Sequence, residues 1–142
     1  IQSVKGVQIG DAYQQAASLG SSAQDEIIGL ANGHIERASN HAGGIEGGIS
    51  NGSVLRVSAA LKPISTVPRA LRSVDLADGT AATALHQRSD TCAVVPAAVI
   101  AQAEVAMVLA DALLEKTGGD SLLEAKRNLA GYLEDVAERT NW

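Results

Sequence analysis

The stretch around which this chain is organised opens with Gly43-Gly44-Ile45-Glu46-Gly47-Gly48-Ile49-Ser50-Asn51-Gly52 and continues to Cys92. Two glycine pairs surround Glu46, and clusters of this kind are usually solvated turns with positive φ angles. A dinucleotide fingerprint is excluded because the stretch contains no Gly-x-Gly. Gly47 and Gly52 have P-loop spacing, but Ser53 follows where that motif requires lysine.

The residues after the glycines predict an antiparallel sheet. Within 54–61, apolar side chains alternate with Arg56, Ser58 and Ala60, which is typical of a half-buried strand. Residues 72–76 and 80–87 predict two further strands, joined by a hairpin turn at 77–79.

Two helices are predicted after this sheet. Pro96 suits the first turn of a helix that runs to Thr117 and stops at Gly118-Gly119. This helix is apolar nearly all round, so we expect other elements to cover most of it. Ser121 and Glu124 predict a capping box for a last helix. Its apolar stripe comprises Leu122, Ala125, Leu129, Leu133 and Val136.

The first forty residues give weaker signals. Asp11 is expected to cap a short helix, with Gln14 as its capping-box partner and Gly20 as its end. Residues 21–40 are expected to be irregular, with a turn at Asn32-Gly33. The order of helix, strands and two helices predicts an α+β fold with an antiparallel sheet.

Composition limits the possible functions. The chain has 142 residues, 46% of them hydrophobic and 2% aromatic, which suits one globular domain with an aliphatic core. Its net charge of −5 argues against a nucleic-acid or anionic-membrane surface. Residues 43–92 contain five basic and four acidic side chains, so this strip carries +1 and the remainder −6. An anionic ligand would need such a strip, although solvated charges explain it almost as well.

The single cysteine, Cys92, excludes a disulfide framework and suits a reducing compartment. It lies in an apolar run and is expected to be a small buried residue. Pro96, Glu104 and Asp111 interrupt the apolar run 92–114, so a buried core helix is preferred to a membrane span. The three histidines have no recognisable metal-ligand spacing.

Two short groups carry candidate chemistry. Arg88 and Asp90 are two residues apart on a segment expected to be extended, so their side chains share one face. They form either a surface ion pair or one wall of a pocket at the edge of a core. Residues 62–66 follow a strand and offer an ammonium group and two hydroxyls, which suits a phosphate, the polar edge of a flavin or a solvated turn.

The glycine stretch, the Lys62-Pro63-Ile64-Ser65-Thr66 motif and the run from Arg88 to Pro96, in this order and spacing, strongly resemble chorismate synthase, most closely its actinobacterial branch. Ile9-Gly10 upstream and the run from Met107 to Asp111 downstream are similar to the same family. The chain departs from the common family pattern at Ser89, where histidine is usual, and at Ala97, where arginine often follows the proline.

The resemblance implies a β-α-β sandwich, in which core helices pack between antiparallel sheets. Residues 1–142 would form the C-terminal portion of a single chorismate synthase domain whose N-terminal portion is absent. The implied reaction of the shikimate pathway is an anti-1,4-elimination of phosphate from 5-enolpyruvylshikimate 3-phosphate to give chorismate, the precursor of the aromatic amino acids. It needs reduced FMN. By resemblance, FMN is bound by Gln2, Ser3, Gly47, Lys62, Pro63, Ile64, Ser65, Thr66 and Arg88.

The resemblance also assigns catalytic roles to Asp90, in proton transfer near the flavin N5, and to Arg88, which binds FMN and substrate anions. Asn51 is a further polar candidate. A cytoplasmic homotetramer, an association with NADP and inactivity of the fragment alone are expected. No metal, nucleic-acid or membrane partner is expected. Two alternatives stay open: a flavin- or phosphate-binding module without catalysis, and a structural oligomerisation domain suggested by the long apolar helix.

Overall fold

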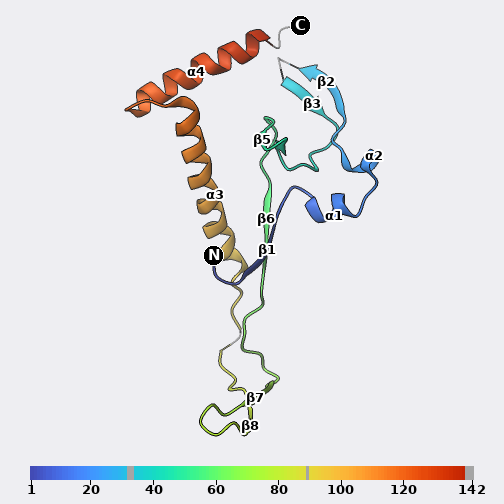
Figure 1. Cartoon of the computed structure of the whole chain (residues 1–142), viewed down its shortest axis with the longest axis vertical. Helices are drawn as coiled ribbons and strands as arrows, with labels where there is room; N and C mark the ends of the chain where they lie inside the picture. The colour runs from blue at the N-terminus through green and yellow to red at the C-terminus, as the bar shows by residue number, and fades with distance from the viewer. Residues whose placement is uncertain (32–33, 89, 140–142) are drawn as a thin grey trace.

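The computed structural model describes residues 1–31, 34–88 and 90–139, which form an elongated arrangement of helices and short strand pairs (Figure 1). Every sheet in these residues is a two-stranded antiparallel ladder, with the pairs β1–β6, β2–β3, β4–β5 and β7–β8. Together with the helices, these ladders make the predicted α+β architecture. Among the described residues these ladders do not join into one layer, so the β-α-β sandwich that the resemblance implies is not completed there.

The central ladder pairs β1 (Val4–Ile9) with β6 (Val57–Leu61). Its register places Val4 opposite Leu61 and Ile9 opposite Val57, with an irregularity after Val4. The predicted strand is confirmed over 57–61, whereas β1 was not predicted. The apolar residues of β6 face the first half of the long helix α3 (Val94–Thr117), and the two elements line a cavity of about 320 Å³.

The predicted first helix is only partly correct. Helix α1 covers Ala12–Ala16, and Gly20 begins a second short helix, α2 (Gly20–Ala23), instead of ending the first. Asp11 is the N-cap residue but makes no side-chain capping bond. The capping prediction is wrong because the Asp11 carboxylate pairs with His41 and Arg56 instead.

The sequence predicts that residues 21–40 are irregular, and this prediction is wrong. They contain α2 and a hairpin of β2 (Ile27–Ala31) and β3 (His34–Arg37), in which Leu30 lies opposite Ile35. The prediction was wrong because these short strands gain their stability from pairing with each other, which local composition does not reveal. The turn predicted at Asn32-Gly33 lies outside the described residues.

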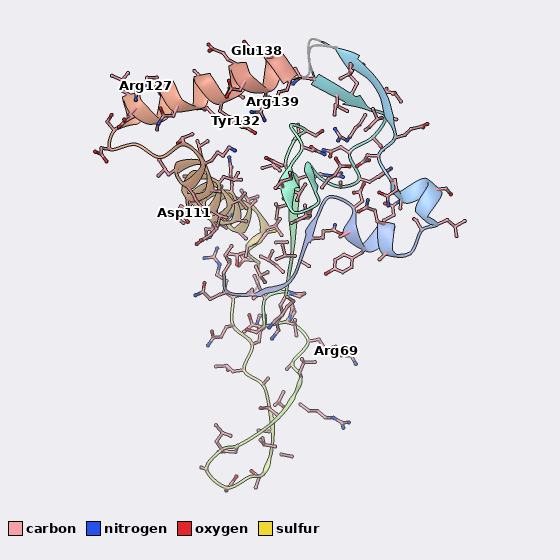
Figure 2. All side chains as sticks on the ribbon, turned by 45° about the horizontal axis from the view of Figure 1, so that its top comes forward. Arg69, Asp111, Arg127, Tyr132, Glu138 and Arg139 are labelled. Carbon is pink, nitrogen blue, oxygen red and sulfur yellow. The ribbon has the colours of Figure 1, made fainter. Side chains whose placement is uncertain are left out.

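A long arm follows β6 and ends in the hairpin of β7 (Arg72–Val74) and β8 (Ala81–Thr83). This hairpin confirms the predicted strand pair, although both strands are shorter than expected. Asp75 closes the connection, since its backbone N–H donates to the Thr80 carbonyl at 2.8 Å. The arm extends away from the helices, and Arg69 projects from it into solvent (Figure 2).

Most ends of the two long helices lie where the sequence predicts them. Helix α3 ends at Thr117, where Gly118 takes a φ of 60° and donates its N–H to the Leu114 carbonyl. Helix α4 (Leu122–Arg139) begins after Ser121, whose Oγ accepts the Glu124 N–H at 3.2 Å. Only this half of the capping box is confirmed, because the Glu124 carboxylate accepts from the Asp120 N–H instead of that of Ser121.

The chain buries little of its apolar surface. Its accessible area is 11395 Å², whereas a compact monomer of 14.5 kDa exposes about 6,900 Å². Of the predicted α4 stripe, Ala125 is buried, but Leu122 is 70% exposed. The prediction that other elements cover most of α3 is wrong for the part of the chain that the structure describes, in which Ala97 is the residue of this helix that is buried.

Two further expectations bear on this exposed surface. Cys92, predicted to be buried, is exposed because no other described segment packs over it. Helix α3 has 24 residues and contains an 18-residue window with a mean hydropathy of 1.8, so its length and composition would also suffice to cross a membrane. Length and composition are weak evidence for a span, and Glu104 and Asp111 within the helix would be costly at bilayer depth.

Candidate functional site

The pairing of β1 with β6 brings the beginning of the chain to the Lys62–Thr66 motif. The Lys62 N–H donates to the Ser3 carbonyl at 2.7 Å, and Ser3 holds a positive φ of 67°, uncommon for a residue other than glycine. Gln2, which precedes it, is exposed. Three residues predicted to bind flavin, Gln2, Ser3 and Lys62, therefore lie together, although Lys62 is about sixty residues from the other two in sequence.

A cavity of about 480 Å³ opens beside this motif. Its walls come from two segments, the residues after β6 and the residues that lead into α3. The lining residues are Leu61, Lys62, Pro63, Ile64, Thr66, Val67, Pro68, Thr91, Cys92, Ala93 and Val94. The cavity is thus mostly apolar with one ammonium group and two hydroxyls at its edge, a composition suited to a ring system that carries an anionic group.

Arg88 and Asp90 form the predicted ion pair. Arg88 Nε donates to Asp90 Oδ1 at 2.6 Å, and the two side chains are 78% and 69% exposed. The expected position at the edge of a core is wrong within this chain, since Leu85 is itself 79% exposed. The pair is linked to the motif described above, because Thr66 Oγ1 donates to the Arg88 carbonyl at 3.4 Å.

The glycine stretch folds into a minimal hairpin of β4 (Ile45–Glu46) and β5 (Ile49–Ser50). Gly47 and Gly48 form its turn with φ angles of 59° and 80°, so both central residues need the freedom of glycine. Apart from the adjacent residues of the chain, no atom of the described residues lies within 4 Å of the Cβ position of either glycine, so the backbone of the turn is open to approach. This hairpin lies at the opposite end of β6 from Lys62 (Figure 1), so the chain alone does not bring Gly47 to the cavity.

Glu46 ties this hairpin to the preceding strand pair. Its Oε2 accepts from Arg37 Nη2 at 2.7 Å and from Asn51 Nδ2 at 2.7 Å. Asn51 also closes the loop beyond the hairpin, because its Oδ1 accepts the Ser53 N–H at 2.9 Å. The amide of Asn51, considered from sequence as a ligand contact, is thus occupied by contacts within its own loop.

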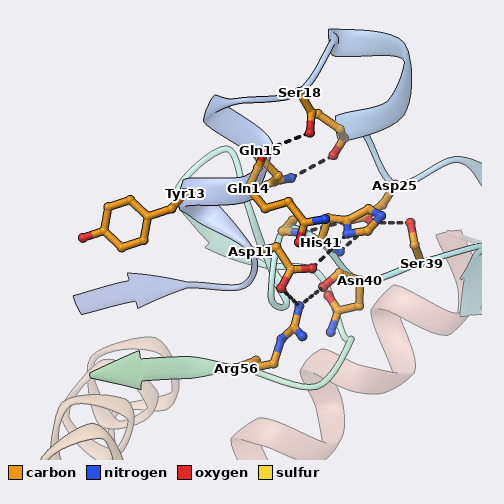
Figure 3. A network of polar contacts seen from close by, with 12 residues as sticks. Asp11, Tyr13, Gln14, Gln15, Ser18, Asp25, Ser39, Asn40, His41 and Arg56 are labelled. Carbon is orange, nitrogen blue, oxygen red and sulfur yellow. Dashed lines mark hydrogen bonds and ion pairs between the residues drawn. The ribbon is translucent and has the colours of Figure 1, made fainter. Parts of the chain in front are cut away.

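A second polar network joins the end of β1, the segment before the glycines and the start of β6 (Figure 3). The Asp11 carboxylate accepts from His41 Nδ1 at 2.9 Å and from Arg56 Nη2 at 3.0 Å. These hydrogen bonds, first that of His41 and then that of Arg56, lower the pKa of Asp11. Backbone bonds run in parallel: Gly10 N–H donates to the Arg56 carbonyl and Arg56 N–H to the Gly43 carbonyl.

Asp25 holds the same segment from the other side. It is only 9% exposed, and its two oxygens accept from Ser39 Oγ at 2.6 Å, from the His41 N–H at 2.7 Å and from the Ala42 N–H at 2.8 Å. Burial raises the pKa of Asp25, but these hydrogen bonds outweigh it and hold the pKa below its ordinary value. The approach to Gly43 and Gly44 is therefore fixed by a buried carboxylate.

Sequence reasoning missed these two networks. Asp11 had been interpreted as a helix cap and Asp25 as part of an irregular segment. The partners of Asp25 are 14 to 17 residues away, and those of Asp11 are farther. Gly10 and Gly43 were the sequence signal that these two segments meet. A Cβ atom on Gly10 would clash with the backbone near Gly43, and one on Gly43 would clash with the backbone of Gly10.

The comparisons with known proteins agree on one family. A family model described as chorismate synthase matches residues 1–114. Chorismate synthases of Beutenbergia cavernae and Corynebacterium diphtheriae are 60% and 61% identical over 139 residues, 98% of this chain but 35% and 34% of those proteins. A solved crystal structure of a chorismate synthase superposes with a TM-score of 0.73 and 38% identity, covering 97% of this chain and 34% of that one.

The chain thus spans about a third of the length of the relatives that it matches. The match extends through the glycine hairpin, the Lys62 cavity, the Arg88–Asp90 pair and most of α3. On the evidence of the family model, the relatives and the fold, this chain belongs to the chorismate synthase family.

Proposed function

We propose that this chain is the C-terminal third of a chorismate synthase, a lyase that converts 5-enolpyruvylshikimate 3-phosphate to chorismate and phosphate. The observation that carries the proposal is the cavity of about 480 Å³ lined by Lys62 and Thr66, which are hydrogen-bonded to the backbone carbonyls of Ser3 and Arg88. The large exposed area supports the view that further polypeptide covers α3 and completes the site.

The residues present fit reduced FMN. Ile64, Val67 and Pro68 offer apolar contacts for a flat ring, and the exposed Lys62 ammonium at the rim suits a phosphate. When bound, the reduced flavin would supply electron density to the allylic system of the substrate. The proposal also includes a contact of the open Gly47 turn with FMN, a contact that this chain alone does not bring to the cavity.

Arg88 and Asp90 take distinct roles in this proposal. The guanidinium of Arg88 uses Nε for Asp90, and its Nη groups are further donors for a phosphate or carboxylate. Asp90 holds Arg88 in this orientation, and its second carboxylate oxygen accepts or relays the proton that leaves the substrate. The elimination balances without net oxidation, because one C–H and one C–O bond break, one C=C bond forms, and phosphate and the proton leave.

The proposal is tested with the full-length protein that carries this chain. Purified protein, reduced FMN and 5-enolpyruvylshikimate 3-phosphate should give equal amounts of chorismate and phosphate, whereas oxidised FMN should give neither. Chain 1–142 alone should give no chorismate, because the cover of α3 and the rest of the site are missing. Flavin binding by the full-length protein without turnover would favour a non-catalytic flavin-binding module, and no flavin binding would favour a structural oligomerisation domain. A cytoplasmic homotetramer associated with NADP is part of the same proposal.

A further inference from the structure

The Gly47-Gly48 turn is held in an unusual way. No described residue beyond their chain neighbours packs on its two glycines, and strands of two residues, Ile45–Glu46 and Ile49–Ser50, give the hairpin little stability of its own. Side-chain contacts at the base of the hairpin must therefore supply much of its position. Glu46, directly before the turn, makes those contacts.

Arg37, which pairs with Glu46, has a guanidinium group whose burial costs free energy. Its side chain is only 11% exposed, and among the described residues its buried Nε and Nη1 atoms have no hydrogen-bond partner. A buried guanidinium is stable only when a counter-charge compensates its lost hydration. Here the counter-charge is Glu46, 2.7 Å from Nη2, so removal of that charge leaves the arginine buried and uncompensated.

Asn51 fixes Glu46 from the other side. Its Nδ2 donates to the same oxygen that Arg37 uses, and its backbone N–H donates to the Gly44 carbonyl at 3.0 Å. Glu46 is thus held between the end of β3 and the loop beyond β5. The three residues Arg37, Glu46 and Asn51 form what we term the hairpin clasp.

We propose that the hairpin clasp positions the Gly47-Gly48 turn for the flavin, so that Arg37, Glu46 and Asn51 are positioning residues and do not touch the ligand themselves. The inference rests on the proposed function, in which this turn meets FMN. The clasp affects flavin binding and not the chemical step. A turn that is already ordered presents its backbone to the ligand, so binding does not carry the entropic cost of ordering the turn. Its loss should lower flavin affinity and leave the chemical step intact.

The test measures FMN affinity and kcat of the full-length protein in wild-type form and as Glu46→Gln. The substitution keeps the size of the side chain but removes the charge that compensates Arg37. We expect the FMN Kd to rise about tenfold, the loss of one charge-assisted hydrogen bond at the lower end of its range. At saturating FMN, kcat should return to the wild-type value. Glu36→Gln is the matched control, because it removes the same charge from the exposed neighbour of Arg37 on β3 and should leave the Kd unchanged.

Coupling within the clasp gives a second measurement. Arg37→Met should raise the Kd to a similar degree, and the double variant Arg37→Met/Glu46→Gln should bind no more weakly than the weaker single variant. Should the arginine variant fail to fold, Asn51→Ala removes only one donor to Glu46 and should raise the Kd severalfold. A melting curve on each variant identifies loss of folding.

Three results would overturn the inference: an unchanged Kd in Glu46→Gln, an equal rise in the Glu36→Gln control, or additive effects in the double variant. In each of these cases the wild-type protein still binds FMN and the proposed function stands. If the wild-type protein bound no FMN, the proposed function would fall and the inference with it.

Discussion

Replacing Asp25 with asparagine should release the segment that leads into the glycine hairpin. Three donors converge on this carboxylate: Ser39 Oγ and the His41 N–H on Oδ1, and the Ala42 N–H on Oδ2. Asparagine offers one oxygen, so its NH₂ group must replace at least one acceptor and face a donor. The least costly orientation places the NH₂ group against Ala42.

The magnitude follows from these contacts. The lost bond to a charged acceptor is worth about 1.5–3 kcal/mol, and the two remaining bonds weaken because the acceptor becomes neutral. At 9% exposure, water compensates little of this loss. We expect Asp25→Asn to lower the free energy of local opening by about 3 kcal/mol, or roughly a hundredfold in the opening equilibrium.

Amide hydrogen exchange in the full-length protein measures this effect at the right place. The amides of His41 and Ala42 should exchange about a hundredfold faster in the variant, while those of β7 and β8 should be unchanged. Asp78→Asn is a matched control, because Asp78 is also a hydrogen-bonded carboxylate, which accepts two bonds from Thr80, but it lies in an exposed turn. Equal protection of His41 and Ala42 in wild type and Asp25→Asn would refute the reasoning.

The same carboxylate predicts a pH dependence. The pKa of Asp25 is lower in the folded protein than its ordinary value of about 4, so the unfolded chain binds this proton more readily. Its contribution is therefore fully present above about pH 4 and is lost as the pH falls through the folded pKa. The stability difference between wild type and Asp25→Asn should be constant from about pH 5 to 7 and shrink below about pH 4.

Four further substitutions test the remaining assignments in the full-length protein. Gly43→Ala should cost about 3 kcal/mol or more in thermal unfolding, because φ is 63° and the new Cβ would meet the backbone of Gly10; a melting temperature equal to wild type would contradict the tight approach. Lys62→Ala should raise the FMN Kd by about tenfold or more through loss of a charge-assisted contact, and an unchanged flavin titration would remove Lys62 from the site. Asp90→Asn should lower kcat by about 10²–10⁴-fold with little effect on flavin affinity; near wild-type kcat would leave the carboxylate as merely the partner of Arg88. Arg88→Ala should weaken FMN or substrate binding as well, so a pure kcat effect would argue against its anion-binding role.

The sequence by itself determined the features that depend on near neighbours. The glycine pair 47-48 requires a turn with two positive φ angles, and the hairpin has it. The end of α3 at Gly118 and the contact of Arg88 with Asp90 likewise follow from residues within a few positions of each other. The family motifs are read from the same short stretches, which explains why the resemblance to chorismate synthase could be stated from sequence.

The tertiary structure alone decided which distant segments meet. Pairing of β1 with β6 places Ser3 against Lys62, and no local pattern specifies that register. Asp11 and His41 are 30 residues apart, and the carboxylate could cap a helix as readily as pair with an imidazole until the chain folds. Burial of Cys92 and of α3 was predicted from apolar character. Burial also requires a partner surface, which the described residues do not supply, and the apolar character of a segment does not say which chain covers it.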